Sequence, residues 1–331
     1  LIFLSVAVPF AHIRRRRIEQ HRPPVCQGHC PPNAKKTAIF CFSSARRFIM
    51  MALLQENYVK KTELEALQKW FTEYVRGFYT NGADDFLDRH VRLKEEHTAR
   101  VCEEMRLITE GMGLSREEEH LAQAAALLHD VGRFEQIRKY RTYADPKSVN
   151  HGQLGVEILD KEGILNDLSA NERAILKTSV HWHSAKTLPE GLDEQTAMFC
   201  KLVRDADKLD VLDLLIGNFR RYYDDPEHFD LEVEFSDRPD VSEPVIQSVL
   251  NRRLVDYRQI QTLHDAQLVL LGWVYDVNFS QTLRRIVRKQ YLEQIAAFLP
   301  DRPRLRQAID SVFCYVRLQI GDSIDRPSPI A

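Results

Sequence analysis

The stretch 122–133, which reads Ala-Gln-Ala-Ala-Ala-Leu-Leu-His-Asp-Val-Gly-Arg, constrains the fold of this chain more than any other. Residues 121–128 are mostly alanine and leucine, both strong helix formers, so we expect a helix that is buried on most of its surface. His129 and Asp130 follow at its last turn, and Gly132 comes just beyond, where a helix can stop. A buried imidazole beside a buried carboxylate is costly unless a partner satisfies both, and a divalent cation would do so.

Composition bounds the class of protein. The chain has 331 residues, of which 44% are hydrophobic and 28% are charged, which is typical of one large or two modest globular domains. No run of eighteen apolar residues occurs, so we expect no membrane-spanning helix and no membrane partner. The six cysteines are scattered apart from Cys26 and Cys30, which favours a reducing, cytoplasmic location over a disulfide framework. The sequence Cys26-Gln-Gly-His-Cys30 suggests a metal knuckle, but no second pair of ligands follows it.

The first fifty residues differ from the rest in charge and in pattern. They carry a net charge of +8 against −2 for the whole chain, which leaves −10 for residues 51–331 and argues against a nucleic-acid partner. Residues 1–50 begin with Leu1, are rich in proline and arginine and show no sustained period, whereas orderly helical sequence follows Met50 and Met51. We therefore expect residues 1–50 to be a non-native upstream extension of the reading frame or a disordered segment. A targeting segment that resembles a transit peptide is the alternative.

From Met51 onward, apolar residues recur at intervals of three and four, which predicts an all-α fold. Capping boxes, in which a serine or threonine precedes a glutamate by three residues, predict helix starts at Thr62 with Glu65, Ser115 with Glu118 and Ser169 with Glu172. Further helices are expected over about 85–111, 150–159 and 196–223, with three or four more within 244–321. The polar segment 134–148 predicts a connector, and 229–235 is a strand-like run within an acidic loop.

Polar residues that can bind a metal occur in a fixed order along these helices. They are His97, His129 with Asp130, His151, His181 or His183, and Asp205 or Asp207. A single histidine in a helical protein is more often a surface or hydrogen-bonded residue than a ligand. Taken together, however, these residues lie near the ends or apolar faces of successive helices, which a bundle can bring to one place.

This series resembles the HD superfamily of metal-dependent phosphohydrolases, over about residues 97–210. The sequence Leu-Leu-His-Asp-Val-Gly-Arg at 127–133 is similar to the central motif of that family, and Ala-Asp-Lys-Leu at 206–209 is similar to its closing motif. The sequence 151–159 resembles a histidine-bearing helix start found in many members. The resemblance implies an HD-domain helical bundle, which we place at residues 51–223 together with the N-terminal helices, followed by a C-terminal helical extension at 224–331.

The resemblance also implies a set of ligands. His97, His129, Asp130 and Asp207 match the four ligands of a first metal, and His151 and His183 fall where members with a second metal place further histidines. Residues two apart lie about 200° around a helix, so His181 and His183 cannot both face one metal if the helix continues. His183 fits the family pattern better, and Lys208 directly after Asp207 repeats the family spacing and favours Asp207 over Asp205.

The chemistry of phosphate esters explains why such residues are needed. A divalent metal lowers the pKa of a bound water toward about 7 and acts as a Lewis acid on the phosphoryl group, so that hydroxide can attack an anionic ester. In a two-metal arrangement Asp130 would be the bridging carboxylate. Imidazole-rich ligation favours Mn, Fe, Co, Ni or Zn over Mg alone, with one or two ions.

Two cations beside the motifs are candidate phosphate contacts. Arg133 follows the central motif and has a planar fork that can bind two phosphoryl oxygens, and Lys208 would add a point charge. The alternative for both is an ion pair with Asp or Glu. We therefore count Asp130, Arg133 and Lys208 as the candidate catalytic residues.

Departures from better-known subfamilies limit what the resemblance implies. His183 is followed by Ser184 where firmly bimetallic members have adjacent histidines, and the signature of cyclic-di-GMP phosphodiesterases is missing. The prediction is a phosphohydrolase for a small phosphorylated molecule, with a nucleoside monophosphate first and a cyclic nucleotide second, in a chain that can form a homo-oligomer. The substrate rests on analogy alone. The alternative is a regulatory HD protein that binds a metal or nucleotide without turnover.

Overall fold

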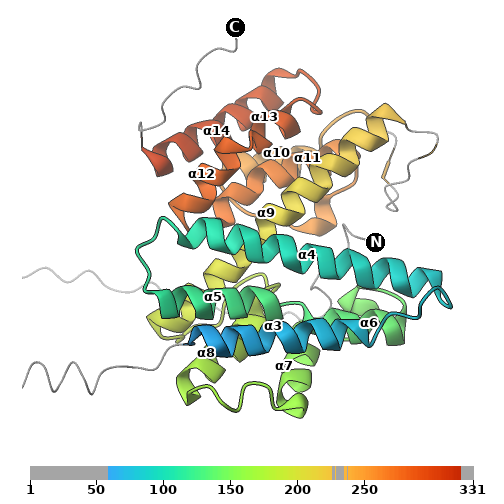
Figure 1. The fold of residues 1–331 in the computed structure, drawn as a ribbon. Helices are drawn as coiled ribbons and strands as arrows, with labels where there is room; N and C mark the ends of the chain where they lie inside the picture. Colours follow the sequence, from blue (N-terminus) through green and yellow to red (C-terminus); the bar gives the residue numbers. More distant parts are fainter. Residues whose placement is uncertain (1–58, 226–227, 229–234, 237, 322–331) are drawn as a thin grey trace, which may run out of the picture. The chain divides into compact units, whose positions relative to one another are not determined.

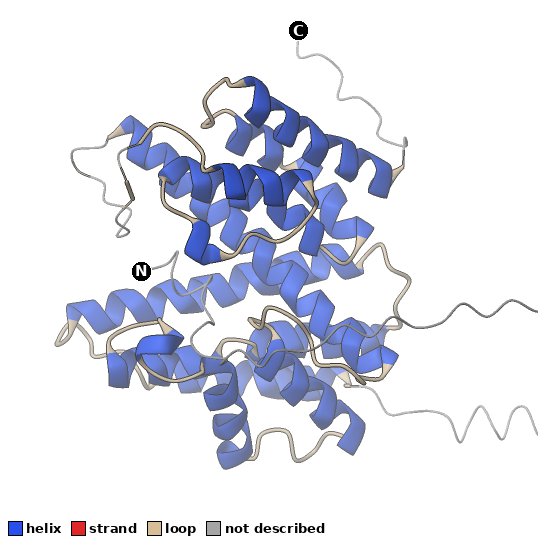
Figure 2. Cartoon of the chain, turned by 180° about the vertical axis from the view of Figure 1, so that it is seen from behind, coloured by secondary structure: helices blue, strands red, loops and turns tan. Residues whose placement is uncertain are grey.

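The computed structural model describes residues 59–225, 228, 235–236 and 238–321. In this part of the chain the regular elements are helices, apart from one isolated bridge between Ser236 and Thr262 (Figure 2). The expected all-α fold is therefore confirmed. Residues 1–50 and the strand-like run up to residue 234 lie outside the described residues. Among the described helices, none combines the length and the apolar character needed to cross a bilayer.

In residues 59–225 seven α-helices precede the acidic loop, and most of their starts follow the sequence signals closely. Ser115 and Ser169 each form the expected capping box, and Asp84 and Asp193 cap the two longest helices by accepting a hydrogen bond from a backbone N–H. The helices are α3 (Lys61–Arg76), α4 (Asp85–Thr109), α5 (Arg116–Leu128), α6 (Val131–Tyr140), α7 (His151–Glu162), α8 (Ala170–Trp182) and α9 (Glu194–Asp224), with a 3₁₀ turn at η1 (Asp145–Lys147) (Figure 1).

The predicted start of α3 and the predicted connector at 134–148 were wrong. The box that starts α3 uses Lys60 and Glu63 instead of Thr62 and Glu65, because the Glu63 carboxylate accepts the Lys60 N–H at 2.7 Å. Most of the polar segment 134–148 is helical, since α6 buries Phe134 and Ile137 and turns Arg138 and Lys139 toward solvent.

Helix α5 lies at the centre of this bundle, where it packs against α3, α4, α8 and α9. Its apolar residues at 121–128 are buried, as the sequence predicts. Alanine side chains let neighbouring backbones approach closely, so α5 brings its own C-terminus, and with it His129, into the interior.

We expected a helix to stop at Gly132, but this residue lies inside a helix. The next helix, α6, begins at Val131, and Gly132 lies inside it at the crossing with α7. A methyl group on Gly132 would overlap the His151 carbonyl oxygen and come within 2.7 Å of the Gly155 nitrogen. The absence of a side chain therefore lets α6 approach the first turn of α7, which carries His151.

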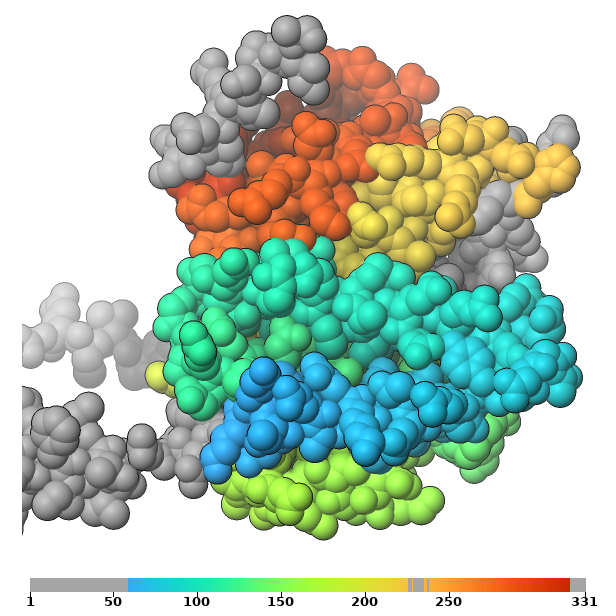
Figure 3. Space-filling view, viewed as in Figure 1, coloured from blue at the N-terminus to red at the C-terminus, as the bar shows by residue number. Residues whose placement is uncertain are grey.

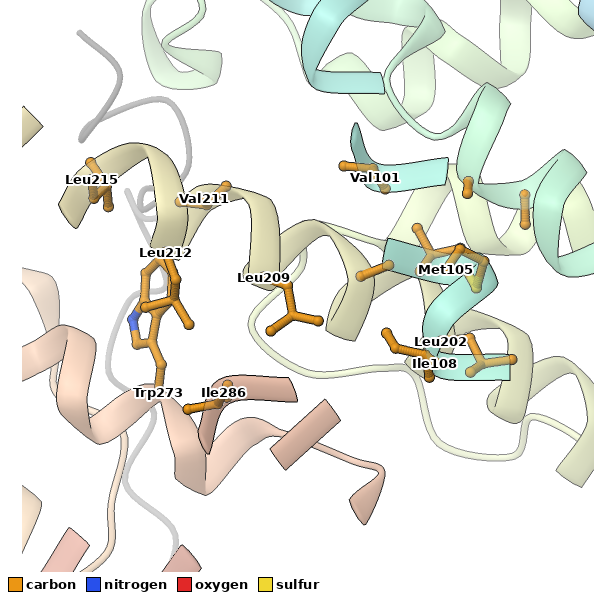
Figure 4. Packing of buried hydrophobic residues seen from close by; sticks show 14 of the residues in the cluster. Val101, Met105, Ile108, Leu202, Leu209, Val211, Leu212, Leu215, Trp273 and Ile286 are labelled. Atoms are coloured by element: carbon orange, nitrogen blue, oxygen red, sulfur yellow. The ribbon is translucent and has the colours of Figure 1, made fainter. Parts of the chain in front are cut away.

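Within the described residues 238–321, five further α-helices follow the acidic loop, where we expected three or four. They are α10 (Glu243–Leu250), α11 (Leu263–Gly272), α12 (Ser280–Arg288), α13 (Tyr291–Ala296) and α14 (Pro303–Ile320), with 3₁₀ turns at η2 (Tyr257–Gln259) and η3 (Trp273–Asp276). Helix α12 packs against α4 and α9, and α13 packs against α9. In Figure 3 the orange residues of the C-terminal helices lie directly against the teal residues of α4. Leu209, Leu212 and Leu215 of α9 join Trp273 and Ile286 in the same core as α4 (Figure 4). Helix α9 therefore joins the bundle to the C-terminal helices.

Candidate metal centre

Six side chains from different helices meet at the centre of the bundle. His97 comes from the middle of α4, and Asp207 comes from α9. The other four lie at helix ends: His129 ends α5, Asp130 joins α5 to α6, His151 starts α7, and His183 ends α8. The structure thus brings together all six residues that the family resemblance assigns to metal binding.

Asp130 lies between two groups of imidazoles. Its Oδ2 is 3.5 Å from His97 Nε2 and 3.6 Å from His129 Nε2. Its Oδ1 is 3.5 Å from His151 Nε2 and 3.4 Å from His183 Nε2. Each carboxylate oxygen therefore faces its own pair of histidines.

The six side chains form two half-sites that share Asp130. The first half-site consists of His97, His129 and Asp207 with Asp130 Oδ2, and Asp207 Oδ1 is 3.3 Å from His97 Nε2. The second half-site consists of His151 and His183 with Asp130 Oδ1. In the first half-site, one ligand atom each from His97, His129 and Asp207 lies within 4.8 Å of the others. The same holds for His129, Asp130 and His183, so the two half-sites are contiguous.

Hydrogen bonds fix the orientation of the imidazoles in the first half-site. His97 Nδ1 is 2.6 Å from Asp210 Oδ2, and His129 Nδ1 is 2.7 Å from the Ala126 carbonyl oxygen. Carbonyl and carboxylate oxygens only accept, so each Nδ1 donates, and in its neutral form each ring presents a proton-free Nε2 to the centre. These two Nε2 atoms lie 3.2 Å apart.

The second half-site repeats this arrangement. His151 Nδ1 is 2.7 Å from Asp145 Oδ2, and His183 Nδ1 is 2.8 Å from the Val180 carbonyl oxygen. The Nε2 atoms of His151 and His183 are 3.0 Å apart. If neither Nε2 carries a proton, these two atoms cannot hydrogen-bond to each other, whereas a cation between them would bind both. An imidazole whose second nitrogen donates to a carboxylate or carbonyl is the usual form of a metal-binding histidine.

Burial and charge set the protonation of the centre. Burial, more than any neighbour, lowers the pKa of His129 to about 4 and the pKa of His151 to about 3, so both rings are neutral near pH 7. Burial and the charge of Lys94 lower the pKa of His97. Its hydrogen bonds with the carboxylates of Asp207 and Asp210 have the larger effect, so the pKa of His97 is raised overall. Burial would raise the pKa of Asp130, yet Lys94 and His129 hold it well below its usual value. The centre thus combines the neutral rings of His129 and His151 with the ionised carboxylate of Asp130.

One atom indicates that a ligand belongs here. Asp130 Oδ1 is buried and has no hydrogen-bond partner, although buried carboxylate oxygens are normally satisfied. The oxygen faces the Nε2 atoms of His151 and His183, which lie 3.0 Å from each other. Nitrogen and carboxylate donors in this arrangement fit a divalent transition metal.

Three residues that sequence reasoning missed complete the centre. Lys94 Nζ is 2.8 Å from Asp130 Oδ2, while Asp210 and Asp145 orient His97 and His151. Lys94 precedes His97 by three residues and Asp210 follows Asp207 by three, so helical spacing could have indicated both. Asp145 lies in η1 and carries no such signal.

Arg133 does not reach toward a substrate in this structure. Its side chain is 3% exposed, and its Nη1 lies 2.6 Å from the Tyr143 carbonyl oxygen and 3.0 Å from Asp145 Oδ1. Because Asp145 also accepts from His151, Arg133 lies behind a ligand of the second half-site. This placement corresponds to the ion-pair alternative for Arg133, and a direct phosphate contact would require its guanidinium to leave a buried network.

Lys208 is likewise held in an ion pair, by a residue of the C-terminal helices. Its Nζ is 2.7 Å from Asp276 Oδ2, and the same carboxylate oxygen is 3.0 Å from Arg204 Nη2. Arg204 Nη1 also donates to the carbonyl oxygen of His183 at 3.2 Å. Asp276 therefore connects the C-terminal helices to both half-sites.

His181 and Asp205, which the sequence analysis disfavoured relative to His183 and Asp207, lie outside the centre. His181 is partly exposed and contacts the ring of Trp182. Asp205 is buried but accepts hydrogen bonds from the backbone N–H groups of Asn278 at 3.0 Å and Phe279 at 3.1 Å, at the start of α12. Asp205 thus stabilises the attachment of α12 to α9.

We expect His183→Ala to weaken metal retention by at least about tenfold, whereas His181→Ala should leave it unchanged, because only His183 presents a nitrogen to Asp130. Elemental analysis of each purified variant after dialysis against a limiting chelator measures the difference. A greater loss in the His181 variant would contradict this assignment.

Comparison with known families agrees with this geometry. Residues 95–214 match the family model of the HD domain, and this range encloses all six ligand candidates. No curated protein and no solved structure gave a match to the chain. Residues 95–214 are thus similar to the HD domain, which is found in a superfamily of metal-dependent phosphohydrolases, and the His and Asp side chains gathered in this range could bind a metal. The domain boundaries at residues 51, 223 and 224 stay predictions.

Proposed function

We propose that this protein is a metal-dependent phosphohydrolase that acts on a small phosphorylated molecule, with a nucleoside monophosphate as the first candidate and a cyclic nucleotide as the second. The observation that carries the proposal is the position of Asp130, whose two oxygens face two separate pairs of imidazole Nε2 atoms. A carboxylate with a purely structural role would face hydrogen-bond donors on both oxygens.

The residues of the two half-sites would hold one or two divalent cations. A cation bound there would lower the pKa of a water molecule toward about 7 and act as a Lewis acid on a phosphoryl oxygen. The chain itself fixes the ligands: Asp210 and Asp145 keep His97 and His151 in the required tautomer and orientation. The imidazole-rich donor set favours Mn, Fe, Co, Ni or Zn over Mg alone.

Burial of the ligands supports a small substrate. The side chain of Asp207 is 18% exposed, whereas that of Asp130 is 4% exposed and those of the four histidines are 0–7% exposed. A substrate would therefore approach beside Asp207, between α9 and its neighbours. The acidic charge of residues 51–331 disfavours a nucleic-acid polymer as that substrate. The choice of a nucleotide rests on analogy with the family.

A screen of phosphorylated metabolites tests the proposal. Protein stripped with a chelator and reloaded with Mn²⁺ should release phosphate from at least one nucleoside monophosphate, or open a cyclic nucleotide, and excess chelator should abolish the reaction. Protein that binds Mn²⁺ and nucleotides but hydrolyses no monoester or diester would instead support the non-catalytic regulatory alternative. Strongly salt-dependent binding to DNA or RNA would contradict the choice of a small substrate.

A further inference from the structure

Lys94 places a buried positive charge inside the first half-site. It lies on α4 one turn before His97, and the residue is 8% exposed. Its ammonium nitrogen is 2.8 Å from Asp130 Oδ2, the same oxygen that faces His97 and His129. The aromatic ring of Tyr143 lies on another side, with its centroid 5.4 Å from Nζ. The ammonium group thus contacts the oxygen that a cation of the first half-site would bind.

The second half-site has no equivalent of Lys94 among the described residues. Arg133 Nε is 3.5 Å from Asp130 Oδ1, but the guanidinium of Arg133 also pairs with the carboxylate of Asp145 at 3.0 Å. Near the first half-site, Arg100 is paired in the same way with Asp210. For Lys94, the carboxylate within ion-pair distance is that of Asp130 itself. Lys94 is therefore a cation whose counter-ion is a candidate metal ligand.

We propose that Lys94 is an internal competitor for the metal of the first half-site: its ammonium group satisfies Asp130 Oδ2 without a metal and must give up that contact when the half-site is loaded. This inference rests on the proposed metal centre. Two cations cannot share one buried carboxylate oxygen without strong repulsion, so the charge of Lys94 lowers the metal affinity of the first half-site. In return, it keeps the carboxylate of Asp130 paired and in place in the metal-free protein.

Metal-binding measurements on variants of Lys94 test this role. Lys94→Gln keeps a hydrogen-bond donor for Asp130 and removes the charge, while Lys94→Met keeps the length of the side chain against Tyr143. Both should bind Mn²⁺ in the first half-site more tightly, by roughly tenfold or more, which is the scale on which a neighbouring charge shifts other ionic equilibria. Titration calorimetry of metal-free protein measures the affinity. Lys69→Gln, an exposed lysine on α3, removes the same charge and should change nothing.

A second set of variants locates the effect. In a His183→Ala background, which disables the second half-site, Lys94→Gln should still tighten Mn²⁺ binding. In an Asp207→Asn background, which weakens the first half-site, the gain should be lost or strongly reduced. A gain of equal size in both backgrounds would overturn the assignment of Lys94 to the first half-site.

The outcomes separate this inference from the proposed function. If the parent protein binds Mn²⁺ and the Lys94 variants bind it no more tightly, the competitor role is wrong while the metal centre stands. If only the Lys94 variants bind Mn²⁺, the competitor role is supported even though the parent has no measurable activity. If neither binds any divalent metal, both the centre and the role of Lys94 are contradicted.

Discussion

Asp130→Asn is expected to reduce phosphohydrolase activity and bound metal by at least about 100-fold, because Asp130 serves both half-sites. Removing a residue that hydrogen-bonds to a metal ligand typically lowers metal affinity or activity 10- to 100-fold. Removing the charge of a carboxylate that is shared by two half-sites should lower them at least as much. Asparagine has nearly the same shape and still offers an oxygen to Lys94, but it lacks the charge that holds a cation. Elemental analysis and the phosphate-release assay measure the two losses.

The fold of this variant should persist, since α5 is held by its buried alanine and leucine residues and not by the metal ligands. Thermal unfolding in excess chelator checks this point. Asp167→Asn makes the same chemical change at an exposed position and is the matched control for activity and metal content. Full activity in the Asp130 variant would remove Asp130 from the site.

Gly132→Ala is expected to lower the free energy of unfolding by about 3 kcal/mol, because the added methyl group would overlap the backbone of α7. The overlapping atoms are the His151 carbonyl oxygen and the Gly155 nitrogen, and neither can rotate away as the end of a side chain would. Helices α6 and α7 must therefore separate. Because His151 starts α7, we also expect weaker metal binding in the second half-site.

Gly217→Ala provides the control for this prediction. Gly217 lies inside α9, and a methyl group there would meet no atom within 4 Å. Alanine is the better helix former, so this variant should be stabilised by up to about 1 kcal/mol. Chemical denaturation of both variants in chelator measures the difference. Equal stability of the Gly132 variant and the parent would show that the backbones of α6 and α7 are not in close contact at this crossing.

The helix starts and the burial of α5 could be predicted because they depend on local sequence. Ser115 and Ser169 mark helix starts through their own capping boxes, and the alanine-rich run at 121–128 indicates burial by itself. His129 and Asp130 then follow a buried helix, which is where polar groups need partners. The resemblance to the HD family supplied the remaining ligands.

Residues that act through contacts between distant segments could not be predicted in this way. The role of Gly132 depends on how closely α7 crosses α6. In the sequence alone, a glycine after a helical run indicates a helix end as readily as a close approach of two helices. Arg133 has the position of a phosphate ligand in the motif, yet Asp145, twelve residues later, folds back to pair with it. The C-terminal helices gave no signal of their contact with the centre, which Asp276 makes through Lys208 and Arg204.

Anomalous X-ray scattering from crystals soaked in Mn²⁺ is the most direct test of whether the six side chains hold a divalent cation at Asp130. We expect anomalous density against Asp130 Oδ2, Oδ1 or both, bordered by His97, His129 and Asp207 on one side and by His151 and His183 on the other. Saturating Mn²⁺ that gives density elsewhere in the molecule and none at Asp130 would contradict the metal centre.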